Sequence, residues 1–88
     1  MPLWDKVKTE LDRAGRAAQG AIDEGRLRLE AFRARQLADR AAQALGYAVH
    51  RARQAGRDLE PDTMARLSEA LSAREAEARR LEEQLTKK

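Results

Sequence analysis

The chain has 88 residues, which is long enough for one small domain. It carries 18 Lys and Arg and 15 Asp and Glu, a formal net charge of +3. Its aromatic share of 3% is too small to fill a deep globular core, and the lack of cysteine excludes disulfides and thiolate metal sites. Because no apolar segment approaches the ~20 residues that span a bilayer and no secretory signal pattern is present, we expect a cytoplasmic protein, with peripheral membrane contact as an alternative.

Residues 1–25 are predicted to form an amphipathic helix. Its apolar residues recur at steps of three and four, which places them on one side of a helix. They form an apolar stripe that consists of Leu3, Trp4, Val7, Leu11, Ala14, Ala18 and Ile22. Gly15, Gly20 and Gly25 each weaken a helix by ~1 kcal/mol relative to alanine. The helix is therefore expected to run on into the next one or to be kinked near Gly20–Gly25, and a full turn that folds the segment back is the alternative.

Residues 26–88 are predicted to form an antiparallel helical hairpin, which gives the chain an all-α, coiled-coil-like fold. The first hairpin helix covers about 26–55, and the second begins at Pro61 after a turn at 56–60. Gly56 suits a helix end in the left-handed region, and proline is favoured at the first position of a helix.

Both hairpin helices carry small or apolar residues at three-and-four spacing along one side. Folding the chain back at Asp58 pairs residues whose numbers add up to about 116, so Ala38 faces Ala78 and Ala34 faces Leu81. Alanine on one helix lets the backbones approach closely, and leucine on the other fills the remaining space.

A different side of residues 26–55 carries an aromatic ridge, whose members lie within about 60° of one another at 100° per residue. The ridge consists of Leu29, Phe32, Gln36, Gln43, Tyr47, His50 and Gln54. It is flanked by one row of Arg26, Arg33, Arg40 and Arg51 and by another of Arg28, Arg35, Arg53 and Arg57. Apolar and aromatic residues edged by arginine are typical of protein interfaces and also suit RNA. If the first segment folds back, Trp4 lands near Tyr47 and the ridge is the inside of a three-helix bundle.

The positive charge lies in the first part of the chain. Residues 1–57 carry 12 Lys and Arg against 7 Asp and Glu, a net charge of +5, whereas residues 58–88 carry 6 against 8, a net charge of −2. The basic part is therefore the candidate for contact with an anionic partner.

The sequence offers no constellation for catalysis. His50 is the only histidine, and the carboxylates are spread over exposed helix faces at distances of three and four residues from arginines. Catalytic carboxylates need a concave and partly dry setting, which a hairpin rarely supplies. We therefore expect no enzyme activity, no catalytic or metal site, no cofactor and no small-molecule substrate.

The opening Met1-Pro2-Leu3-Trp4-Asp5-Lys6-Val7-Lys8 resembles the M-G-[IL]-F-D-K-h-K start of small bacterial coiled-coil proteins, although proline replaces the glycine. The stretches Leu45-Gly46-Tyr47-Ala48-Val49 and Ala55-Gly56-Arg57-Asp58-Leu59-Glu60-Pro61 resemble the central pattern and glycine turn of the same proteins. The resemblance implies a helical hairpin. Some members carry a C-terminal zinc ribbon, which this cysteine-free chain lacks. The apolar stripe is also similar to the membrane-binding first helix of phage-shock and membrane-remodelling proteins.

Together these patterns indicate a helical scaffold or accessory subunit that binds a protein partner or a second copy of itself. The residues expected to bind the partner are Leu3, Trp4, Val7, Leu11, Leu29, Phe32 and Tyr47. The residues expected to contact an anionic partner are Arg26, Arg33, Arg40, Arg51, Arg28, Arg35 and Arg53. A nucleic acid or ribosome is one alternative partner, and a membrane surface held by the N-terminal helix is another.

Overall fold

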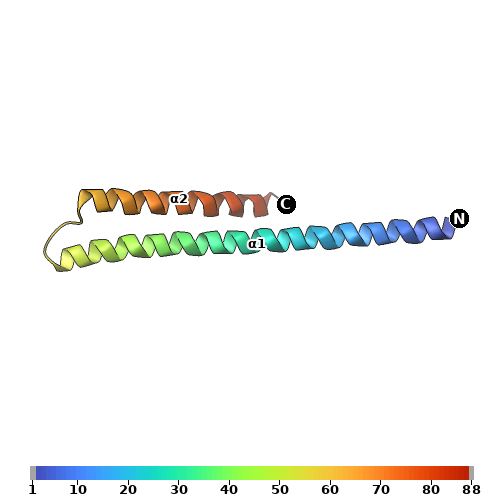
Figure 1. Ribbon diagram of the computed structural model, residues 1–88, viewed down its shortest axis with the longest axis horizontal. Helices are drawn as coiled ribbons and strands as arrows, with labels where there is room; N and C mark the ends of the chain where they lie inside the picture. The colour runs from blue at the N-terminus through green and yellow to red at the C-terminus, as the bar shows by residue number, and fades with distance from the viewer. Residues whose placement is uncertain (1, 88) are drawn as a thin grey trace.

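The computed structural model describes residues 2–87, so Met1 and Lys88, the outermost residues of the two expected segments, lie outside the described residues. The chain is an antiparallel hairpin of two helices, α1 (Pro2–Gln54) and α2 (Pro61–Thr86), which lie side by side over the length of α2 (Figure 1). The molecule measures 83 × 16 × 16 Å. This confirms the predicted all-α helical hairpin.

Helix α1 is continuous over 53 residues and includes both the expected N-terminal segment and the first hairpin helix. At 1.5 Å per residue, 53 residues span about 80 Å, close to the length of the whole molecule. The alternative of a full turn near Gly20–Gly25 is wrong, and Trp4 does not reach Tyr47, because the two lie about 65 Å apart along one helix. Glycine lowers helix propensity but does not by itself break a helix, and among the described residues only Gly56 has a positive φ.

The turn between the helices has the geometry that the sequence predicts. Gly56 has φ 74°, and its N–H donates to the carbonyl of Arg53 at 3.0 Å. The N–H of Arg57 donates to the carbonyl of Ala52, also at 3.0 Å. These two bonds form a Schellman motif, which satisfies the last carbonyls of α1. Pro61 is the first residue of α2, as predicted.

The helices pack through small residues. The buried core consists of Ala31, Ala34, Ala38, Ala52, Ala78 and Leu81. Within it, Ala31, Ala34, Ala78 and Leu81 form one cluster, against which Leu27 and Leu85 pack. The cluster brings Ala34 and Leu81 together, as predicted, and the alanines allow the two backbones to lie close together.

Candidate functional site

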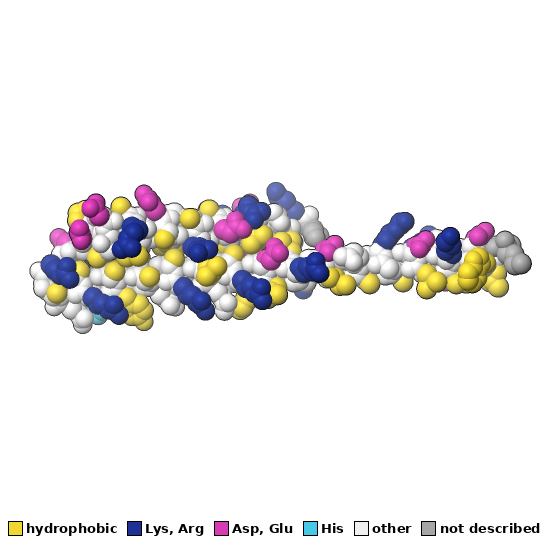
Figure 2. Space-filling model, in the orientation of Figure 1, with side chains coloured by type: hydrophobic (Ala, Val, Ile, Leu, Met, Phe, Trp, Pro, Cys, Tyr) yellow, Lys and Arg dark blue, Asp and Glu magenta, His cyan; other side chains and the backbone are white. Residues whose placement is uncertain are grey.

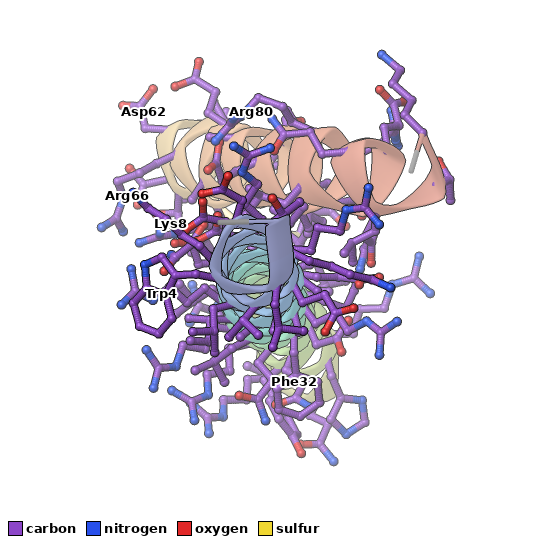
Figure 3. All side chains as sticks on the ribbon, turned by 90° about the vertical axis from the view of Figure 1, so that its right-hand side faces the viewer. Trp4, Lys8, Phe32, Asp62, Arg66 and Arg80 are labelled. Atoms are coloured by element: carbon purple, nitrogen blue, oxygen red, sulfur yellow. The ribbon has the colours of Figure 1, made fainter. Side chains whose placement is uncertain are left out.

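The continuity of α1 places the apolar stripe and the aromatic ridge on one surface. At 100° per residue Trp4, Leu11 and Tyr47 point within about 20° of one another, whereas Leu27 and Leu45, which face α2, point about 160° away. We call this surface the outer face of α1. Viewed along the axis from the N-terminal end, Phe32 points away from α2 and Trp4 points sideways from α1 (Figure 3).

The apolar residues of the outer face are exposed. Trp4 is 69% exposed, Phe32 60% and Tyr47 61%. The other large exposed hydrophobic residues on this face are Leu3, Val7, Leu11, Ile22 and Leu29. Figure 2 shows hydrophobic side chains along the lower edge of the molecule, on the side of α1 away from α2. Large exposed apolar patches are characteristic of surfaces that bind a protein or a membrane.

Residues 3–25 of α1, here called the arm, extend beyond α2 (Figures 1 and 2). Every side chain in the arm is exposed except that of Glu24, which is half-buried. The side of the arm in line with α2 is polar, with Thr9, Arg13 and Arg16. Helices that contain several glycines and pack on no neighbour are marginal in water. The large apolar residues of the arm lie on its other side, in line with the aromatic ridge.

The structure divides the arginine rows into engaged and unengaged side chains. Arg28 pairs with Glu24 at 3.1 Å, and Arg35 pairs with Glu82 on α2. Within the described residues, Arg26, Arg33, Arg40 and Arg53 are exposed and form no ion pair. The guanidinium of Arg51 lies 5.9 Å from the centroid of the Tyr47 ring, within the range of a cation–π contact.

The Arg35–Glu82 pair joins the two helices and was not expected from the sequence. The Arg35 Nε donates to Glu82 Oε2 at 3.1 Å, and its Nη2 donates to Oε1 at 2.6 Å. This bidentate hydrogen bonding raises the pKa of Arg35 and lowers the pKa of Glu82. Arg35, expected to contact an anionic partner, is thus already bound to a carboxylate of its own chain. The register that places Ala34 beside Leu81 was the signal that could have revealed it.

Two shallow depressions lie on the ridge, and sequence reasoning missed both. The first, here the Tyr47 depression, is lined by Gln43, Gly46, Tyr47 and His50. The second, here the Arg40 depression, is lined by Gln36, Asp39, Arg40 and Gln43. Each set follows the spacing i, i+3, i+4 and i+7, which forms the hole for one side chain of a neighbouring helix in a coiled coil. The absence of a side chain at Gly46 was the available signal for the first.

The arrangement contains little that could perform chemistry. His50 is exposed and lines the Tyr47 depression. Over residues 2–87, no three His, Asp or Glu side chains group closely enough to hold a metal ion. In that same part of the chain, neither helix has a stretch that is both apolar and long enough to cross a bilayer.

Compared with protein-family models, with curated proteins and with solved structures, the chain gives no significant match. The outer face, its two depressions and its flanking arginines are therefore the features of this molecule that bear on its function.

Proposed function

We propose that this chain is a non-enzymatic helical scaffold or accessory subunit that binds its partner through the outer face of α1. The observation that carries the proposal is the row of exposed apolar side chains on the outer face, which runs from Trp4 to Phe32 and includes Tyr47 beyond a polar stretch. It lies opposite α2, so the hairpin does not use it for its own folding. The hairpin holds the helix rigid, and the outer face provides the binding surface.

The composition of the outer face supports a protein partner. Aromatic residues and arginine are enriched at the energetically important positions of protein interfaces. Phe32 and Tyr47 are large, exposed and carried on a rigid helix, so binding them orders few additional degrees of freedom. The exposed arginines beside them favour a partner surface that carries carboxylates.

The test is a double variant, Phe32→Ala with Tyr47→Ala, compared with a second pair of exposed residues on α2, Arg66→Ala with Gln84→Ala. Size-exclusion chromatography and pull-down from a native extract measure association, and circular dichroism measures helix content. We expect the first variant to lose association with unchanged helix content and the second to behave like the parent chain. Unchanged association of the first variant would contradict the proposal.

A nucleic acid is the second candidate partner, favoured by the charge of α1. Residues 26–54 carry 7 Arg against 2 Asp and Glu, a net charge of +5. Binding to phosphates releases counterions, so the logarithm of the affinity should fall steeply with the logarithm of the salt concentration. Neutralising Arg33 and Arg40 should weaken such binding and reduce the slope. A flat salt dependence would rule this candidate out.

A further inference from the structure

This inference rests on the proposed function and names the partner. We propose that the outer face of α1 binds the outer face of a second copy of the chain, with the two α1 helices antiparallel. The two-fold axis passes at the level of Leu27, so residues whose numbers add up to 54 lie opposite one another. Each arm then covers the aromatic ridge of the other copy, and each α2 stays on the far side of its own α1.

The register follows from helix geometry and from the extent of the exposed surface. At 100° per residue, antiparallel outer faces match position for position most closely at number sums of 36, 54 and 72. A sum of 36 leaves the ridge uncovered, and a sum of 72 leaves the arm uncovered. Only a sum of 54 covers the whole exposed face from Trp4 to His50 in both copies.

The two depressions fit this register. The Tyr47 depression is centred between Gly46 and Tyr47, so it lies opposite Val7 of the second copy. The Arg40 depression is centred seven residues earlier and lies opposite Ala14. Val7 and Ala14 are both apolar, and the larger of the two, Val7, lies opposite the Tyr47 depression. In coiled coils, apolar side chains insert into four-residue holes of this kind.

The sizes of the remaining side chains are also complementary. The small arm residues Gly25, Ala18 and Ala14 lie opposite the longer Leu29, Gln36 and Arg40. Nothing on the hairpin lies within 4 Å of a Cβ placed at Gly25, so this position is open to a neighbouring helix. Small residues opposite large ones permit close packing near the two-fold axis.

The charges favour the antiparallel arrangement over a parallel one. Residues 3–25 carry 4 Lys and Arg against 5 Asp and Glu, a net charge of −1, whereas residues 26–54 have a net charge of +5. Antiparallel pairing places the weakly acidic arm along the basic ridge. Parallel pairing would place Arg40 beside its own copy and bring the two basic ridges together. The acidic balance of the arm also disfavours an anionic membrane as its partner.

The contact area is in the range of stable dimers. From Trp4 to His50 the outer face is about 70 Å long, and a width of about 10 Å gives roughly 700 Å² per copy. The dimer would thus bury roughly 1,400 Å² in total, within the 1,200–2,000 Å² of specific protein interfaces. Such a contact is isologous and closes on itself, so it produces a dimer and not a filament.

Introduced cysteines test the register directly, because the chain has none of its own. An equimolar mixture of Ala18→Cys and Gln36→Cys should form a mixed disulfide on mild oxidation, since the two positions lie opposite each other. Each variant alone should stay unlinked, because its two copies lie about 27 Å apart along the dimer. Gly20→Cys mixed with Gln36→Cys is the off-face control and should also stay unlinked.

A pair of charge variants tests the contact at the Tyr47 depression. Val7→Asp should weaken the dimer by about tenfold or more, because two buried valines are lost per dimer. Thr9→Asp, which places the same charge on the opposite side of the arm, should leave the dissociation constant nearly unchanged. Sedimentation equilibrium measures the constant, with the 9.9 kDa chain as the monomer reference.

Two outcomes would overturn the dimer. Self-linking of Ala18→Cys alone would show either parallel pairing or antiparallel pairing at a sum of 36, and both contradict the proposed register. A monomer at every concentration would show that no second copy binds. Flotation of such a monomer with phosphatidylcholine–phosphatidylglycerol vesicles, lost on Trp4→Ala, would identify a membrane as the occupant instead. A monomer that still forms a complex dependent on Phe32 and Tyr47 in extract would refute the dimer and keep the proposed function. Absence of both the dimer and the complex in extract would refute the dimer and the proposed function.

Discussion

Leu81 is the largest side chain in the buried core, and its replacement by alanine tests whether the hairpin depends on that core. Leu81 is 6% exposed and packs against Ala31 and Ala34 of α1 and Ala78 of its own helix. Three carbons leave the core, which at ~0.8 kcal/mol per methylene lowers the free energy of unfolding by about 2.5 kcal/mol. We expect little additional cavity energy, because the thin two-helix core can close around the gap.

A loss of this size is large for a chain of 88 residues, whose expected stability is about 4–13 kcal/mol. It should lower the melting temperature by about 10–20 °C, measured by circular dichroism at 222 nm with all proteins at equal concentration. Leu37→Ala is the matched control, because Leu37 is 39% exposed and lies outside the core. The free energy of unfolding of Leu37→Ala should fall by less than about 1 kcal/mol. Equal losses for the two variants would refute the proposed dependence on the Leu81 cluster.

The remaining predictions concern the turn and the inter-helix ion pair. Gly56→Ala should destabilise the hairpin by about 1 kcal/mol, because an L-residue is strained at φ 74°. Gly20→Ala should instead stabilise α1 by up to ~1 kcal/mol. Urea unfolding followed by circular dichroism should therefore show changes of opposite sign in the free energy of unfolding. The stabilising contribution of the Glu82 carboxylate should be fully present above the pKa that this group has in the unfolded chain. It should be lost as the pH falls through the lowered pKa of Glu82 in the folded chain. Glu82→Gln should therefore reduce the fall in the free energy of unfolding at acidic pH. An unchanged fall would show that the bond to Arg35 contributes nothing to stability.

The hairpin could be predicted from the sequence because its determinants are local. Gly56 and Pro61 mark the helix ends by their own backbone preferences, and the three-and-four spacing places Ala34 opposite Leu81 once the turn is fixed. The course of the arm could not be decided in the same way. Glycines near position 20 lower helix propensity whether the helix continues or bends, so propensity alone does not distinguish the two. The partners of the Arg35–Glu82 pair are 47 residues apart, so no local spacing indicates the pair, and only the register that places Ala34 beside Leu81 brings them together.

The apolar side of α1 changes along the length of the helix. From Leu27 to Ala52 the inner face is apolar and packs on α2, but before Leu27 the same side of the helix is polar, with Thr9 and Arg16. An extension of α2 over the arm would therefore bury no apolar surface. The apolar residues of the arm instead continue the line of Phe32 and Tyr47 on the outer face. A helix whose apolar side changes in this way presents a different surface to each side, and the outer surface is the one that the proposed dimer would cover.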